Sequence, residues 1–148
     1  MWANIERRPA LLRGLMPGTE NRHNDWQPLA LSILRIVVGL LFLEHGLAKL
    51  VGFPTAATMP AMFALLWFAG VIELLGGALV AIGLCTRAAA FIMSGEMAIA
   101  YFYAHAPRNF FPLLNGGDAA VLYCFIFLYL AVTGGGGWSL DRLIAQRK

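Results

Sequence analysis

Four long apolar stretches dominate the chain, and short segments containing proline, glycine or polar residues separate them. The stretches predict helices over residues 28–51, 62–84, 88–104 and 119–133. Pro28 suits a helix start, and Gly52, Gly83, Pro107 and Gly134 suit the four ends. Backbone polar groups in lipid need internal hydrogen bonds, and these four stretches hold nearly all the apolar residues. We therefore expect an all-α fold, a bundle of four transmembrane helices, rather than a sheet.

The basic residues predict how such a bundle is oriented. Residues 1–27 contain four arginines, the second turn contains Arg87, and residues 136–148 contain three arginines or lysines. The opposite face offers only Lys49 and Arg108. Because positive loops stay inside, residues 1–27 and 136–148 are predicted cytoplasmic tails around a membrane domain of residues 28–135. No uninterrupted apolar core follows the early charges, so we expect the first segment to be a tail and not a cleaved signal.

The composition supports a membrane protein and excludes several other classes. Hydrophobic residues make up 59% of the chain and charged residues 13%, whereas soluble domains carry roughly 25% charged residues. The net charge of +3 comes mainly from the tails, which favours the lipid bilayer as a partner and not nucleic acid. Cys85 and Cys124 form no CxxC pair and no metal-ligand pattern, and we expect no metal site.

The apolar stretches also predict which faces are buried. On a helical wheel, one stripe of the first helix gathers small, polar and charged residues, while His45 borders it and Glu44 faces away. Small residues on a stripe let helices pack closely, so we expect these stripes to face the bundle. The first-helix stripe is Ser32, Arg35, Gly39, Phe42, Gly46 and Lys49; the second is Ala69, Glu73, Gly77 and Ala81; the third is Ala89, Met93, Glu96, Ala100 and Tyr103.

Charged residues within the apolar stretches predict two polar groups. Arg35, Glu73 and Glu96 are expected to form a buried charge network, in which one arginine between two carboxylates leaves one glutamate to be neutralised by a proton.

The second group lies at the outer end of the predicted bundle. Histidine and carboxylate side chains beside aromatic rings can bind a polar ring and move protons, and interfacial capping of helix ends is the structural alternative. This candidate polar or quinone site consists of His45, Lys49, His105, Asn115, Asp118 and Tyr123.

Several short motifs together resemble the DoxX/DoxD-like family of small four-helix membrane proteins. The motifs are Arg35…Gly39…Phe42…His45-Gly46…Lys49…Gly52-Phe53-Pro54, Glu73…Gly76-Gly77…Gly83…Thr86-Arg87-Ala88-Ala89, Met97…Ala100, His105-Ala106-Pro107, Asn115-Gly116-Gly117-Asp118…Leu122-Tyr123 and Gly137-Trp138-Ser139-Leu140-Asp141.

The resemblance implies a four-helix bundle in the bacterial cytoplasmic membrane. Some members are quinone-linked, such as the small subunits of thiosulfate:quinone oxidoreductase, and others associate with oxidative-stress enzymes. The positions that the resemblance marks as functional are Arg35, His45, Lys49, Glu73, Asn115 and Asp118, with Arg87 as a turn residue. Glu44 and Glu96 have no counterpart in the family pattern.

Three functions are compatible with these residues. The first is a quinone-interacting subunit of a membrane redox system, with no intrinsic cofactor and with electrons from a partner chain; His45 and His105 are too loosely spaced to indicate haem. The second is a non-catalytic scaffold or partner subunit, or a homo-oligomer. The third is a small proton or solute pathway through Glu73 and Glu96. Nothing resembles a separate catalytic domain, so a standalone enzyme is not expected.

Overall fold

The computed structural model describes residues 22–54 and 60–147, and every described element is helical. The predicted N-terminal tail lies outside the described residues as far as residue 21. The elements are α2 (Arg22–Val51), α3 (Leu65–Ile82), α4 (Thr86–Ala100), the π-helix η1 (Tyr101–His105), α5 (Pro112–Asn115), α6 (Asp118–Thr133) and α7 (Leu140–Ala145). No strand occurs in these two ranges, which confirms the all-α prediction for them.

The helix limits differ from the predicted ones at two informative places. Pro28 lies inside α2 and does not open it, because the helix already begins at Arg22. The third helix changes to π geometry after Ala100 and continues to His105. In α2, Trp26–Val51 is long and apolar enough to cross a membrane, as is all of α3, while the other described helices are shorter.

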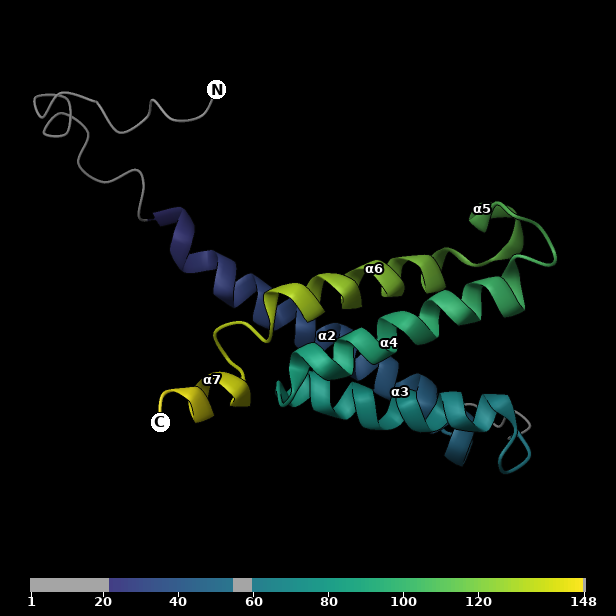
Figure 1. Ribbon diagram of the computed structural model, residues 1–148, viewed down its shortest axis with the longest axis horizontal. Helices are drawn as coiled ribbons and strands as arrows, with labels where there is room; N and C mark the ends of the chain where they lie inside the picture. The colour runs from purple at the N-terminus through teal and green to yellow at the C-terminus, as the bar shows by residue number, and fades with distance from the viewer. Residues whose placement is uncertain (1–21, 55–59, 148) are drawn as a thin grey trace, which may run out of the picture.

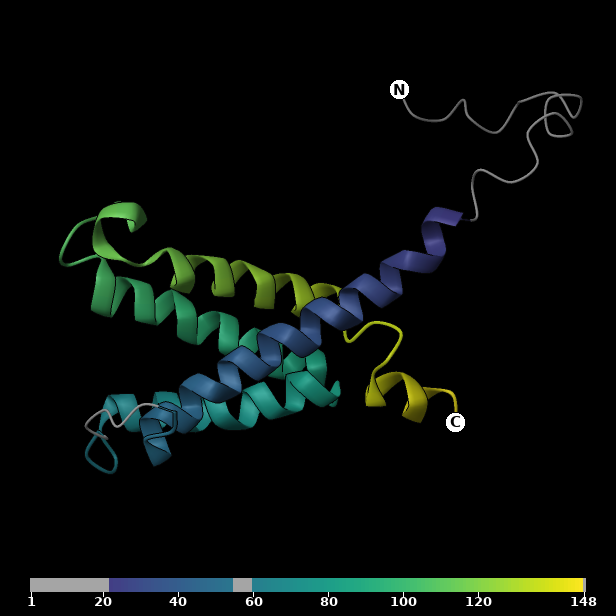
Figure 2. The same ribbon diagram turned by 180° about the vertical axis from the view of Figure 1, so that it is seen from behind.

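The helices form two packed pairs. Helix α2 packs along α3, α4 packs along α6, and α3 joins the pairs through α4. Figures 1 and 2 show α2 running obliquely across the other helices. The first turns of α2 and helix α7 lie at one end of the molecule, here named the α7 end. The short helix α5 lies at the opposite end, here named the α5 end.

Glycines set the close approach of α2 and α3. A Cβ atom added to Gly39 would lie 2.7 Å from the backbone nitrogen of Ala81, and one added to Gly77 would meet the backbone of α2 just as closely. Gly46, seven residues after Gly39, faces the backbone of α3 in the same way. The predicted small-residue stripes therefore form a real helix–helix contact, of the kind that membrane helices use.

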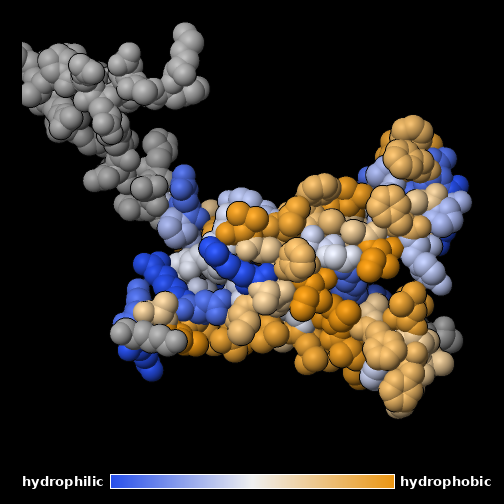
Figure 3. Space-filling view, in the orientation of Figure 1, coloured by the Kyte–Doolittle hydropathy of each residue, from blue (hydrophilic) through white to orange (hydrophobic). Residues whose placement is uncertain are grey.

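The interior is compact, while the outside is apolar. Phe42, Val80, Met93, Phe127 and Leu130 form the centre of a core to which α2, α3, α4 and α6 contribute. Large apolar side chains remain exposed along the outer faces of all four helices, and Figure 3 shows this apolar surface beside the more hydrophilic α7 end. Exposed apolar patches of this extent in a soluble protein would promote association, whereas lipid covers them in a membrane protein.

Candidate functional site

An ion pair joins α2 to α3 inside the molecule. Lys49 Nζ lies 2.5 Å from Glu73 Oε1, and Glu73 is only 1% exposed. Gly70, one turn before Glu73, makes this approach feasible, because a Cβ there would lie 3.0 Å from Lys49 Cβ. The second carboxylate oxygen, Glu73 Oε2, is buried and has no hydrogen-bond partner among the described residues. The pair therefore leaves one acceptor available in the interior.

The carboxyl group of Glu96 lies near the ion pair of Lys49 and Glu73. Both of its oxygens are buried, and neither has a hydrogen-bond partner within residues 22–54 and 60–147. Glu96 and Lys49 line the same cavity of about 380 Å³ between α3 and α4, which opens to the outer surface past exposed side chains such as Leu66 and Ile99. Apart from Tyr103, the other walls are apolar: Leu65, Leu66, Phe68, Ala69, Ile72, Ile92, Gly95, Met97, Ile99, Ala100 and Ala104. An apolar cavity with a few convergent polar groups is the usual form of a small-molecule site.

Arg35 lies in a different environment from the predicted one. Its guanidinium donates to four backbone carbonyls: Gly135 at 2.8 Å, Val80 and Ala81 at 2.5 Å, and Trp138 at 2.6 Å. Arg35 is fully buried and forms no ion pair with either glutamate. The predicted network of Arg35, Glu73 and Glu96 is therefore corrected: Lys49 takes the place of Arg35 beside Glu73. Carbonyls at the end of α3 and in the segment after α6 satisfy the guanidinium instead.

The other predicted polar residues form separate contacts. The ring of His45 lies 6.3 Å from that of Tyr123 and 6.4 Å from that of Phe42, measured between centroids, and His45 Nδ1 contacts the carbonyl oxygen of Leu41 at 2.9 Å. His45 is exposed, while Tyr123 is half-buried. The structure thus brings His45 and Tyr123 together in an aromatic group of α2 and α6, and their role in ligand binding stays a prediction.

His105 and Asn115 organise the loop at the α5 end. His105 Nδ1 lies 3.2 Å from the carbonyl oxygen of Asn115, whose amide donates to the carbonyl oxygen of Asn109 at 2.6 Å. The amide oxygen of Asn115 accepts a hydrogen bond from Gly117 N. Through these hydrogen bonds, Asn115 stabilises the turn before α6. Asp118 is the exposed first residue of α6, where a carboxylate suits the helix dipole.

The segment after α6 packs at the α7 end, where the sequence predicted only a cytoplasmic tail. Besides the carbonyls that bind Arg35, it supplies Asp141, whose two carboxylate oxygens accept hydrogen bonds from Cys85 N at 2.7 Å and Thr86 N at 2.9 Å. Asp141 therefore caps α4 from a distant part of the chain. Although burial alone would raise the pKa of Asp141, the hydrogen bonds from Thr86 and Cys85 and the charge of Arg35 lower it overall.

Because its pKa is lower in the folded than in the unfolded protein, Asp141 stabilises the fold above its unfolded pKa of about 3.9. We expect this contribution to disappear as the pH falls through the folded pKa. Asp141→Asn should lower the free energy of unfolding at pH 7 by about 1–2 kcal/mol and flatten the acid side of the stability curve. Reversible unfolding in detergent between about pH 2 and pH 7 measures both effects. A variant that keeps the wild-type acid dependence would contradict this role.

Sequence comparisons place these features in a family. The DoxX family model matches residues 30–106, which include Arg35, Lys49, Glu73 and Glu96. An uncharacterized protein of Haemophilus influenzae is 44% identical over 128 residues, covering 82% of this chain and 96% of the relative. No solved structure matches the chain.

Two further relatives are more distant. An uncharacterized membrane protein of Mycobacterium tuberculosis is 28% identical and covers 81% of this chain and 84% of its own length. A Bacillus subtilis protein named "Putative oxidoreductase CatD" is 27% identical and covers 78% of this chain and 87% of its own length. The match over more than half of the chain and the Haemophilus relative lead to one conclusion: this chain is a membrane protein of the DoxX family.

Proposed function

We propose that the chain crosses the bacterial cytoplasmic membrane four times, through α2, α3, α4 with η1, and α6. The 18 residues of α3 span about 27 Å at 1.5 Å per residue, close to the hydrocarbon thickness. Helix α6 is shorter, with 16 residues, but it packs along α4 over most of its length (Figure 1). The excess of basic residues at the α7 end supports a cytoplasmic location for both termini.

Within this bundle, we propose that the cavity between α3 and α4 binds the ring of a quinone. The observation that carries the proposal is Glu96, whose unpartnered carboxyl group lines an apolar cavity together with Lys49. A quinone ring needs apolar walls and a few hydrogen-bond donors for its carbonyl oxygens. The volume of about 380 Å³ falls within the usual range of small-molecule sites.

In this proposal, each polar residue in or beside the cavity has its own role. Lys49 donates a hydrogen bond to one quinone carbonyl, while Glu73 holds the lysine in place. A carboxyl group without a partner is tolerated in an apolar interior in its protonated form, so Glu96 supplies a second donor and a proton. The chain would act as a subunit of a membrane redox system, with the electrons supplied by a partner chain. The oxidoreductase name of the Bacillus relative agrees with this role.

Gly95 provides a clean test of the site. It lines the cavity, and a Cβ added to it meets no atom within 4 Å. Gly95→Leu should therefore fill the cavity without disturbing the packing. We expect the protein, purified in mild detergent, to retain quinone in a stoichiometric amount and to rebind decylubiquinone after delipidation. Gly95→Leu should weaken decylubiquinone binding at least about tenfold, which corresponds to 1.4 kcal/mol.

Gly95→Ala serves as the matched control, because one methyl group leaves most of the cavity open. Glu96→Gln keeps a hydrogen-bond donor but cannot exchange a proton, and should bind decylubiquinone while losing any proton uptake coupled to its reduction. Equal binding of decylubiquinone by the wild type and Gly95→Leu would overturn the quinone site. A co-purifying enzyme without quinone would instead indicate a scaffold. Proton uptake into liposomes without quinone, abolished by Glu73→Gln, would indicate a proton pathway.

A further inference from the structure

An open hollow with charged residues in its lining lies at the α7 end, far from the cavity between α3 and α4. The first turn of α4, the glycine run after α6 and the start of α7 border this surface hollow of about 640 Å³. The charged residues in its lining are Arg87, Asp141 and Arg142. None of them belongs to the proposed quinone site, so a ligand in this hollow would be distinct from the quinone.

The glycine run brings the two arginines to the same loop. A Cβ added to Gly134 would lie 3.4 Å from Arg87 Nε, and one added to Gly137 would lie 3.4 Å from Arg142 Nη1. Both guanidinium groups therefore lie against bare backbone. Within the described ranges neither arginine has an ion pair or a side-chain hydrogen bond. The carboxylate of Asp141 is already occupied by two backbone N–H groups.

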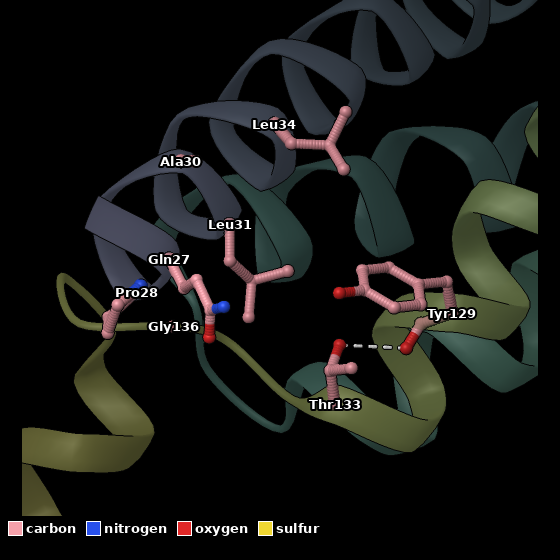
Figure 4. Close-up of a pocket in the computed structure, with 8 residues that line it drawn as sticks. All are labelled: Gln27, Pro28, Ala30, Leu31, Leu34, Tyr129, Thr133 and Gly136. Atoms are coloured by element: carbon pink, nitrogen blue, oxygen red, sulfur yellow. Dashed lines mark hydrogen bonds between the residues drawn. The ribbon is translucent and has the colours of Figure 1, made fainter. Parts of the chain in front are cut away.

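An apolar surface adjoins this hollow. A second hollow of about 810 Å³ shares Thr133 and Gly136 with it and is lined by Leu31, Leu34 and Tyr129. Figure 4 shows the side chains of Leu31 and Tyr129 facing each other across this second hollow. Nearby, Trp138 is 63% exposed, and tryptophan is typical of the level of the lipid headgroups. Positive charge thus lies beside apolar surface and near an exposed tryptophan.

We propose that this hollow binds the phosphodiester group of an anionic glycerophospholipid such as phosphatidylglycerol. The guanidinium groups of Arg87 and Arg142 donate to the phosphate oxygens, as arginine does at phosphate sites. An acyl chain of the same lipid lies along Leu31, Leu34 and Tyr129. Inorganic phosphate has the same charge chemistry, but it makes no use of the adjoining apolar surface. A zwitterionic lipid would bring an ammonium group close to the two arginines.

Cys85 supplies a reporter, because it is exposed and lines the same hollow. In a Cys124→Ser background, the protein is placed in nanodiscs of phosphatidylcholine with increasing fractions of phosphatidylglycerol, and alkylation of Cys85 by N-ethylmaleimide is followed. We expect phosphatidylglycerol to slow the alkylation. The double variant Arg87→Gln/Arg142→Gln should raise the fraction needed for half-maximal protection by about tenfold or more.

The matched control is Arg108→Gln/Arg147→Gln, which removes the same charge from exposed positions outside the hollow and should leave the protection unchanged. Inorganic phosphate added to phosphatidylcholine nanodiscs should not slow the reaction. Equal protection by inorganic phosphate, or equal loss of protection in both double variants, would overturn the lipid site. Gly95→Leu should keep the protection, so a failure of the quinone site and a failure of this site give different results.

Discussion

Replacing Lys49 with methionine is expected to lower the free energy of unfolding by about 3 kcal/mol, the lower end of the usual cost of removing one partner of a buried ion pair, because the Lys49 side chain is 29% exposed. Glu73 is 1% exposed and has its single charged contact with Lys49. Without the ammonium group, its carboxylate would remain in the interior close to the unpaired Glu96. Reversible unfolding in mixed micelles, followed by circular dichroism, measures the loss.

The double variant Lys49→Met/Glu73→Met separates the ion pair from the packing of the side chains. Removing both charges leaves an apolar contact between α2 and α3, so the double variant should be more stable than Lys49→Met alone. Glu44→Gln, at an exposed position of the same helix, should change stability by less than about 0.5 kcal/mol. If the double variant is no more stable than the single one, Lys49 does not act through Glu73.

Arg35→Leu should destabilise the bundle by a similar amount, about 3–5 kcal/mol. The reason differs from that for Lys49, because here backbone carbonyl groups, and not a carboxylate, lose their hydrogen-bond donor. Val80, Ala81, Gly135 and Trp138 would each lose a charged donor, and the hydrogen bonds to Val80 and Gly135 are buried. The leucine side chain offers no replacement. The same unfolding assay in mixed micelles measures this effect.

Arg35→Lys keeps the charge and tests the geometry. An ammonium group has three donors on one atom and cannot span carbonyls that the planar guanidinium reaches with three nitrogens. We therefore expect Arg35→Lys to recover only part of the lost stability. Arg108→Gln, at an exposed position near the α5 end, provides the control. Full recovery by lysine would show that the positive charge alone is needed at this position.

The stripe of the first helix was predicted well from the sequence. Ser32, Arg35, Gly39, Phe42 and Gly46 are all buried, and Glu44 is exposed. Helical spacing fixes which residues share a face, so this part follows directly from the order of residues. The third-helix stripe was less accurate, because Tyr103 is 67% exposed. The change to π geometry after Ala100 rotates the residues that follow.

The pairing of the buried charges could not be predicted in the same way. Depth counted separately along each helix placed Arg35 with the glutamates and Lys49 at the outer end. The offset between α2 and α3 depends on which glycines meet, and Gly46 meets the backbone of α3 near Gly70. This offset places Lys49 against Gly70, one turn before Glu73, so that its ammonium group reaches the Glu73 carboxylate. The acceptors of Arg35 could not be predicted because they are backbone carbonyls, which every residue carries. The run of four glycines before Trp138 was the available indication that backbone groups of this segment take part in close contacts.

The contacts of Arg35 also determine the order in which the protein can be completed during synthesis. Arg35 leaves the ribosome with the first described helix, whereas Gly135 and Trp138, two of its four acceptors, follow about a hundred residues later. A nascent chain therefore holds an incompletely satisfied arginine until residues 134–141 have been translated. An interrupted chain that stops after α6 would keep the acceptors at Val80 and Ala81 but lack those at Gly135 and Trp138, leaving two donors of the arginine unsatisfied.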